Sequence, residues 1–308
     1  MKQKHHYGDS YELDVYQEFY QENVRSAYFL KSVLQNGEVR FDSMSGDSWE
    51  YQVANQLKTY FDFAVFAKRP HSEARWFLDK FYHFHLTHFK RHIFPNEQHE
   101  LRLDEVSITR PGERLSYGID PINWCRAVYW ALAYNDMQSI AWLDQFNEQS
   151  MDTSGIAQIH MAEFNIVKAI LNPQERDLVA AIKAFMQVDV TALSELESRV
   201  AADVLLFRRS VHLPRIDCLL SVFCHEDEQT YQQKMLDALD KFAQCAHKMD
   251  KAGEPFPKFA LDFVGLARVA YSGKGYLIPD HPYLPQWLIT EDLTDITPPP
   301  EPDSIPTL

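Results

Sequence analysis

Apolar side chains recur every three or four positions along most of this chain, which is the spacing of one face of an α-helix. The clearest example is residues 229–250, whose apolar side is formed by Tyr231, Met235, Leu239, Phe242, Ala246 and Met249. The pattern predicts a helical hairpin that begins at Pro121 and turns at Asn135-Asp136. It also predicts helices over residues 12–35, 49–68, 72–93, 155–171, 174–187, 190–208, 214–224, 229–250 and 257–272.

Glycine is scarce, with 10 of 308 residues, well below the average of about 7%. Few glycines leave little room for tight turns or for loops that cradle a phosphate, and the chain has no GxGxxG, GxxxxGK or GxSxG motif. These absences argue against a nucleotide-binding α/β enzyme, and no cofactor is expected.

The helical period is broken once, between residues 101 and 117. Residues 101–108 partly alternate between apolar and polar, and Arg110-Pro111-Gly112 predicts a turn, so a short strand or β-hairpin is expected there. We therefore expect an all-α fold of antiparallel helical hairpins, stacked in one globular, solenoid-like domain over residues 1–290.

The composition changes at the end of the chain. Residues 291–308 hold five prolines and five acidic residues, without any Lys or Arg. Such a segment buries too little apolar surface to offset the entropy of ordering it. The sequence therefore predicts a disordered acidic tail, and deletion of residues 292–308 is expected to cost almost no stability.

The chain is strongly acidic. Asp and Glu total 44 against 30 Lys and Arg, which gives a net charge of −14. A surface of this charge repels nucleic acid and anionic membranes and attracts a basic partner, although solubility alone also explains it.

The cysteines and the beginning of the chain bear on the compartment. Cys125, Cys218, Cys224 and Cys245 lie mostly within apolar helical patterns, and no CxxC pair occurs. The chain lacks a run of about 18 apolar residues for a membrane span, and its first residues lack the apolar core of a signal peptide. A cytoplasmic protein with reduced thiols is expected.

The range 72–93 is rich in histidine. His85, His88 and His92 have the spacing i, i+3, i+7 and share one helix face, and the last two have the i, i+4 spacing with which two imidazoles bind one zinc ion. These three are the candidate metal ligands, and they would suit a metal-dependent hydrolase. No glutamate stands between them as in HExxH. The alternative, which we favour, is a helix without metal whose rings pack beside Phe77, Phe81, Phe84 and Phe89.

The last apolar helix is followed by a proline-framed aromatic cluster. Gly273 and Gly275 suit the left-handed conformation that ends helices, and Pro279, Pro282 and Pro285 hold the next segment extended or in tight turns. We expect this segment to dock on the helix over residues 257–272. The side chains expected in the contact are Tyr283, Leu284 and a buried Trp287.

Two segments carry a family resemblance. Residues 267–275, with Tyr283-Leu-Pro-Gln-Trp-Leu288, resemble the C-terminal signature of immunity protein family 49 of bacterial polymorphic toxin systems. Residues 124–143 (WCRAVYWALAYNDMQSIAWL) are similar to that family's central helical hairpin. Residues 124–143 and 267–288 together span 42 of the 308 residues. The resemblance implies an all-α immunity protein without enzymatic activity, which neutralises a cognate toxin in interbacterial competition.

The family resemblance also implies a type of partner. Toxins of such systems are often nucleases, and an acidic inhibitor gains association rate against a basic cleft. The expected mechanism is stoichiometric occlusion of the toxin. Acidic side chains at helix ends and in the proline-framed loop are the candidate contacts: Glu226, Asp227, Glu228 and Asp280. A helical scaffold or adaptor that binds a peptide or protein partner is the alternative.

Overall fold

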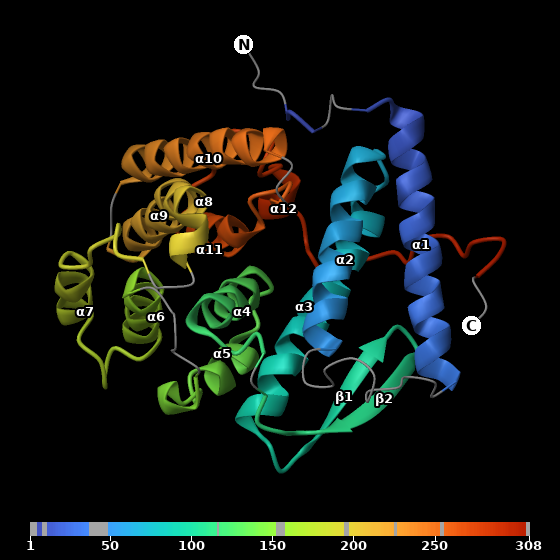
Figure 1. Cartoon of the computed structure of the whole chain (residues 1–308), viewed down its shortest axis with the longest axis horizontal. Helices are drawn as coiled ribbons and strands as arrows, with labels where there is room; N and C mark the ends of the chain where they lie inside the picture. Colours follow the sequence, from blue (N-terminus) through green and yellow to red (C-terminus); the bar gives the residue numbers. More distant parts are fainter. Residues whose placement is uncertain are drawn as a thin grey trace. The chain divides into compact units, whose positions relative to one another are not determined.

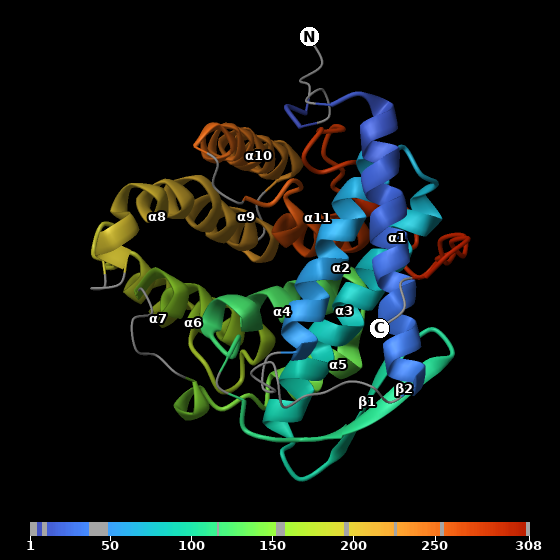
Figure 2. The same cartoon turned by 45° about the vertical axis from the view of Figure 1, so that its right-hand side comes forward.

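The computed structural model describes residues 5–7, 11–36, 49–115, 117–151, 158–193, 197–224, 227–252 and 256–305. This part of the chain is helical except for one two-stranded antiparallel sheet (Figures 1 and 2), which confirms the expected fold class. The helices are α1 (Leu13–Asn36), α2 (Trp49–Phe66), α3 (His71–Ile93), α4 (Pro121–Ala133), α5 (Met137–Leu143), α6 (Gln158–Leu171), α7 (Leu178–Phe185), α8 (Ala201–Phe207), α9 (Leu213–Phe223), α10 (Glu228–Lys251), α11 (Val264–Lys274) and α12 (Trp287–Thr290), and the strands are β1 (Gln98–Leu103) and β2 (Val106–Pro111). None of the described helices is both long and apolar enough to cross a membrane.

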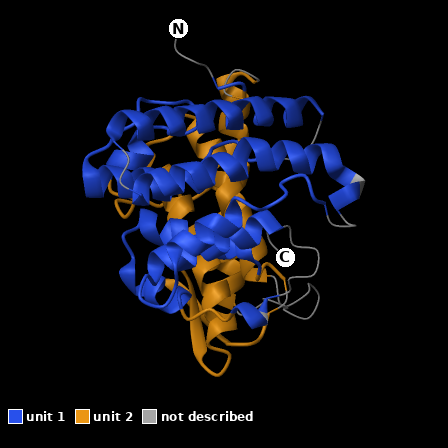
Figure 3. Cartoon of the chain, turned by 90° about the vertical axis from the view of Figure 1, so that its left-hand side faces the viewer, with its two compact units in different colours: residues 1–6, 120–144, 148–291 blue, residues 7–119, 145–147, 292–308 orange. Residues whose placement is uncertain are grey.

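The chain forms two compact units (Figure 3). Unit 1 comprises residues 1–6, 120–144 and 148–291, and unit 2 comprises residues 7–119, 145–147 and 292–308. The chain thus begins in unit 1, passes to unit 2 at Tyr7, and returns to unit 1 at Asp120. It leaves unit 1 again for residues 145–147 and, finally, at Asp292. This division differs from the single domain over residues 1–290 that the continuous helical pattern predicts.

Unit 2 contains α1, α2, α3 and the β-hairpin. The buried face of α1 includes Tyr20, Val24 and Ala27, as its helical period predicts. The Tyr20 hydroxyl donates to Glu73 Oε2 on α3 at 2.6 Å, so this helix pair is joined by a buried polar contact as well as by apolar packing.

The hairpin turns earlier than predicted. Leu103 pairs with Val106, and the turn between them contains Asp104 with φ 55°. Arg110 and Pro111 belong to β2, so the predicted turn at Arg110-Pro111-Gly112 is wrong. Asp tolerates the left-handed conformation, and Trp76 Nε1 donates to Asp104 Oδ1 at 2.9 Å, which holds the turn in place.

Unit 1 contains α4 to α12. Aspartates cap helices of this unit: Asp136 accepts from Ser139 N at the start of α5, and Asp227 accepts from Thr230 N at the start of α10. The apolar face predicted for α10 is buried except for Met249, which is partly exposed.

The region around residue 208 differs from prediction. The sequence predicts separate helices over residues 190–208 and 214–224, whereas α8 runs through a π-helical turn, Arg208–His212, directly into α9. Pro214 has no N–H to donate back to the preceding turn, and Leu213 N instead bonds the carbonyl of Arg208. The continuous helix places Arg208 and His212 on the buried side.

The closing segment docks within unit 1 largely as predicted. Gly275 ends α11 with φ 74°, whereas Gly273 remains helical. Tyr283 and Leu284 are buried, and Ala260 N donates to Tyr283 O at 2.8 Å. Trp287, the third side chain expected in this contact, is only half-buried.

Residues 292–305 make defined contacts in unit 2. Leu293 and Pro299 are buried, and Arg75 on α3 donates to Asp295. The predicted disorder of the tail therefore disagrees with the described residues. Composition identified the absence of a core-forming pattern but not the surface on which the segment lies.

The helices α11 and α4 approach each other closely at Gly265 of α11. A Cβ atom at this position would lie less than 3.0 Å from the backbone carbonyl of Tyr129 on α4. Because backbone atoms cannot yield as a flexible side chain does, we expect Gly265→Ala to destabilise unit 1 by about 3 kcal/mol.

Chemical denaturation followed by tryptophan fluorescence measures this loss. Gly273→Ala on the same helix is the matched control, because a Cβ there meets nothing within 4 Å. Equal unfolding midpoints for the two variants would contradict the close approach of α11 and α4.

Candidate functional site

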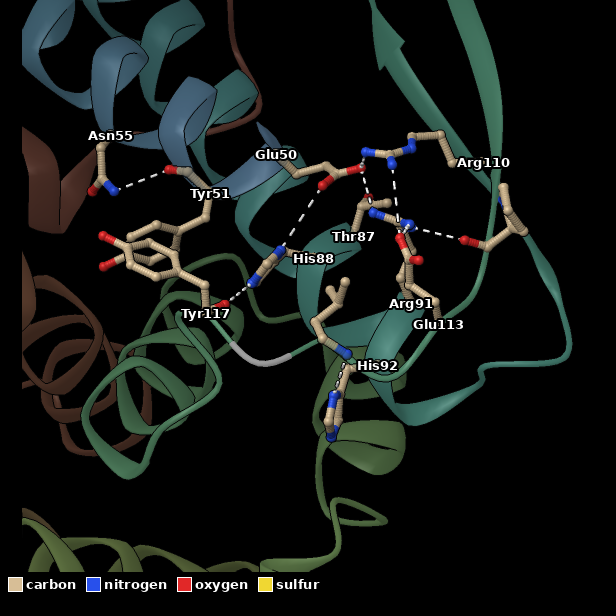
Figure 4. Close-up of polar contacts among 12 residues, drawn as sticks. Glu50, Tyr51, Asn55, Thr87, His88, Arg91, His92, Arg110, Glu113 and Tyr117 are labelled. Carbon is tan, nitrogen blue, oxygen red and sulfur yellow. Dashed lines mark hydrogen bonds and ion pairs between the residues drawn. The ribbon is translucent and has the colours of Figure 1, made fainter. Parts of the chain in front are cut away.

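A buried ionic cluster in unit 2 is the candidate functional site (Figure 4). Glu50 lies in the first turn of α2, Arg91 in the last turn of α3 and Arg110 on β2. Glu50 Oε1 accepts from Arg91 Nη1 at 2.7 Å and from Arg110 Nη1 at 2.6 Å. Glu113 also bonds Arg91 and lies 3.7 Å from Arg110 Nη2. The cluster thus joins a helix start, a helix end and a strand.

The charges of this cluster balance. Two carboxylates, Glu50 and Glu113, face two guanidinium groups, Arg91 and Arg110. Burial acts to raise the pKa of Glu50, but His88 and the two arginines outweigh burial and hold that pKa below its ordinary value. Burial also lowers the pKa of Arg110. Glu50 is therefore an ionised group without solvent exposure, stabilised by its cations.

His88 adds an incomplete contact to the cluster. Its Nε2 lies 2.8 Å from the carbonyl oxygen of Tyr117, and because a carbonyl only accepts, Nε2 carries hydrogen. The other ring nitrogen, Nδ1, lies 3.9 Å from Glu50 Oε2. Neither of these two buried atoms has a hydrogen-bond partner within the described parts of the chain.

The chain beside His88 is tightly fitted. Gly118 has φ 72°, and a Cβ there would lie 3.0 Å from the Tyr51 ring and 3.3 Å from His88 Nε2. Tyr117 is 56% exposed, and its ring lies 5.5 Å from that of Tyr51. Glycine is therefore required where the segment crosses His88.

This geometry favours a structural role in the conformation described. A general base needs a ring nitrogen that can reach a substrate, and His88 Nε2 instead faces the carbonyl of Tyr117. The cluster connects α2, α3, β2 and the segment that leads from unit 2 into unit 1 at Asp120.

The three candidate metal ligands have separate environments. The His85 ring stacks on Phe81 with centroids 5.6 Å apart, and His92 Nδ1 accepts from Leu115 N at 3.1 Å. His88 contacts Tyr117 as described above. No group of three or more His, Cys, Asp or Glu side chains suited to a metal occurs among the described residues. In the described structure the three rings do not converge on one point, and each has its own partner.

The candidate toxin contacts lie in unit 1, except that Glu226 is outside the described residues. Asp227 caps α10, and its carboxylate accepts from Thr230 Oγ1 at 2.8 Å. Glu228 is exposed in the first turn and accepts from Gln232 Nε2 at 3.0 Å. Asp280 is exposed and accepts from Gln286 N at 3.1 Å.

The same unit brings these acidic positions toward a common region. Gln232, one helical turn after Glu228, also donates to the carbonyl of Leu277 at 2.7 Å. The beginning of α10 therefore contacts the extended segment that carries Asp280. Two of the predicted positions, Glu228 and Asp280, combine exposure with a fixed local backbone.

A second buried cluster, in unit 1, was not predicted from the sequence. Glu163 on α6 accepts from Arg215 Nε and Nη2, each at 2.7 Å, and from the Tyr129 hydroxyl at 2.7 Å. Asp262 Oδ2 accepts from Arg215 Nη1 at 2.9 Å and from Arg126 Nε at 3.1 Å. The cluster joins α4, α6 and α9 to the residues before α11.

Two histidines border this second cluster. His212 Nδ1 lies 3.0 Å from Arg215 Nη2, so this nitrogen accepts, and the His160 ring lies 4.3 Å from the His212 ring. Burial lowers the pKa of His212 to about 4 and that of His160 to about 2. Burial would raise the pKa of Glu163, but Arg215 and His212 lower it. The site therefore holds neutral imidazoles beside an ion pair.

The sequence signal for the cluster in unit 1 is a single charged residue within an apolar helical pattern. Glu163 in QIHMAEFNIVKAIL and Arg215 in LPRIDCLLSVF are such residues. The cysteines gave no further site: Cys125, Cys218 and Cys245 are buried, Cys224 is exposed, and all four are free thiols.

Comparisons with family models, with curated proteins and with solved structures find no match to the chain. The resemblance to immunity protein family 49 therefore rests on residues 124–143 and 267–288 alone.

Proposed function

We propose that this protein is an immunity protein that binds a cognate bacterial toxin, acting on a cytosolic target, and neutralises it by stoichiometric occlusion. The observation that carries the proposal is the packing of α4 against α11, the two helices that contain residues 124–133 and 267–274 of the segments with the family resemblance. The helices α4 and α11 contact each other at Tyr129 and Gly265, although 130 residues of chain separate their ends. Arg126 of the first helix also pairs with Asp262, just before the second.

The charge of the chain supports a basic partner. At −14 the protein attracts a positively charged cleft, such as that of a nuclease, over distances near the Debye length of about 8 Å at physiological salt. Exposed Glu228 and Asp280 are the positions that we assign to the first encounter. Their backbone is fixed by α10 and by the segment on which it rests, so binding orders little additional chain.

The decisive experiment is a titration of toxin activity. The toxin encoded beside this protein, assayed on its own substrate, should lose all activity at one equivalent of the purified protein. Complete inhibition far below one equivalent would mean catalytic turnover and would exclude the binding mechanism. No inhibition at a large excess would exclude the immunity function itself.

Charge reversal at the encounter positions should slow association. We expect Glu228→Lys/Asp280→Lys to reduce the association rate constant about tenfold at low salt and much less at high salt. Stopped-flow mixing with the toxin measures the rate.

Glu175→Lys/Asp237→Lys is the matched control, with the same charge change at two exposed positions of unit 1. Equal rates for the two double variants would remove Glu228 and Asp280 from the interface. Such a result would not bear on whether the protein inhibits the toxin, which the titration above tests separately.

A scaffold or adaptor is the second candidate. It is favoured by the contacts of residues 292–305, since unit 2 already holds an extended segment. An adaptor would bind its partner without abolishing any toxin activity, so the same titration separates the two functions.

A further inference from the structure

The C-terminal segment contacts unit 2 at every second residue. Asp295 bonds Arg75, Thr297 N donates to the carbonyl of Ser72 at 3.1 Å, and the Tyr28 hydroxyl donates to the carbonyl of Pro299 at 2.8 Å. Contacts at i, i+2 and i+4 are those of an extended chain that presents one edge to a surface. We call Tyr28, Ser72 and Arg75 the tail-binding surface.

Arg75 recognises both the backbone and the side chain of the segment. Its Nε donates to the carbonyl of Asp295 and its Nη2 to Asp295 Oδ2, each at 2.9 Å. The Arg75 side chain is only 4% exposed, whereas that of Asp295 is 73% exposed. The Arg75 guanidinium therefore belongs to the buried part of unit 2, and the Asp295 carboxylate binds it from the solvent side. A guanidinium that donates to two acceptors of one residue is specific in geometry as well as in charge.

The segment suits this surface in stiffness and charge. Pro298, Pro299 and Pro300 fix their backbone angles, which reduces the entropy lost when the chain becomes ordered. The Asp292 carboxylate accepts from Thr294 N and Oγ1, which fixes the turn before the extended part. Leu293 supplies a buried apolar side chain next to that turn.

From these contacts we propose that unit 2 contains a binding site for an extended, acidic, proline-rich peptide. Residues 292–305 are its resident ligand, held in cis and exchangeable for a free peptide of the same sequence. The tail is thus a ligand rather than the disordered end that its composition predicts. Its covalent connection keeps it at an effective concentration in the millimolar range, so a free peptide competes poorly while the resident tail is intact.

The test uses the full chain and a fluorescent peptide of residues 291–305. Asp295→Lys in the protein places a cation of the resident tail against the Arg75 guanidinium. The repulsion should release the tail and leave the tail-binding surface free for the peptide. We expect this variant to bind the wild-type peptide at least about tenfold more tightly than the unaltered protein does, as measured by fluorescence anisotropy.

Asp303→Lys is the matched control, because it makes the same charge change in the same tail, eight residues beyond the anchor. It should bind the peptide as weakly as the unaltered protein. A peptide carrying Asp295→Lys should not bind the Asp295→Lys protein, and Tyr28→Phe in that protein should weaken binding of the wild-type peptide several-fold.

Two results would overturn the proposal. One is equal peptide affinity for the Asp295→Lys and Asp303→Lys proteins. The other is equal affinity of the Asp295→Lys protein for the wild-type and Asp295→Lys peptides, which would mean that Arg75 does not read the acid. Both proteins keep the core of unit 2 unaltered, because both substitutions lie at exposed positions.

Discussion

Replacing Arg215 with methionine should reduce the unfolding free energy of unit 1 by about 3–5 kcal/mol. The substitution leaves the Glu163 carboxylate fully buried without the guanidinium that donates two hydrogen bonds to it. It also removes a bond to Asp262. The loss therefore comes mainly from an uncompensated buried charge rather than from a missing attraction.

Urea denaturation measures this effect, with Lys183→Met as the control in the same unit. Lys183 is exposed, so the same kind of substitution there should change stability by less than about 0.5 kcal/mol. The double variant Glu163→Met/Arg215→Met should recover part of the loss, since no unpaired charge remains between them. If Arg215→Met matched Lys183→Met, the ion pair would contribute nothing to the fold.

The helices were predictable because burying one face of a helix requires apolar residues at every third or fourth position, a pattern that is visible in the sequence. The buried face of α10 and the caps at Asp136 and Asp227 follow from contacts within one or two turns. Local rules of this kind require only neighbouring residues, which the sequence displays directly.

The hairpin shows where local rules fail. Arg110-Pro111-Gly112 has the composition of a turn, yet the chain turns at Asp104, whose carboxylate is held by Trp76 from another helix. Both Asp104 and Arg110-Pro111-Gly112 are acceptable places for a turn. The bond from Trp76, 28 residues before Asp104 in the chain, favours the turn at Asp104. Pro111 is tolerated because it is the last residue of its strand.

The buried ionic clusters could not be predicted for a related reason. Glu50 meets Arg91 and Arg110 across 41 and 60 residues, and Glu163 meets Arg215 across 52. Each charge looks in the sequence like an interruption of an apolar face. Only the fold shows that each interruption faces another of opposite sign.

The tail-binding surface was missed because the tail and its partners were considered separately. The acidic, proline-rich composition of residues 291–308 is typical of disorder. A short segment also becomes ordered when a folded surface supplies the contacts that it lacks, here Arg75, Ser72 and Tyr28. Composition describes the segment alone and cannot include that surface.

Acid should destabilise unit 1 through His160 and His212. Burial lowers the pKa of His212 to about 4 and that of His160 to about 2, from an ordinary value of 6.5. The unfolded chain therefore binds two protons below pH 6.5 that the folded chain does not. Stability from this pair is fully present above pH 6.5 and falls by up to about 1.4 kcal/mol per pH unit for each ring as the pH decreases.

Between pH 7.5 and pH 5.0 the two rings together should cost about 4 kcal/mol, because pH 5.0 lies about 1.5 units below the ordinary histidine pKa. The groups around them act on this balance: Arg215 and Arg208 oppose protonation, and Glu163 favours it. The His212 contribution stops growing near pH 4, whereas that of His160 continues toward pH 2. Burial also lowers the pKa of His5 and His281. Unit 1 therefore contains further histidines, besides His160 and His212, that make its stability sensitive to acid.

The variant His160→Gln/His212→Gln isolates the pair, because glutamine keeps a polar group but does not titrate. Its unfolding free energy should depend less steeply on pH than that of the unaltered protein, by up to two protons between pH 6 and pH 4.5. If the double variant lost stability with acid as steeply as the unaltered protein, the two rings would not be buried in the neutral form. The ion pair of Glu163 and Arg215 would then have to share its site with a third charge.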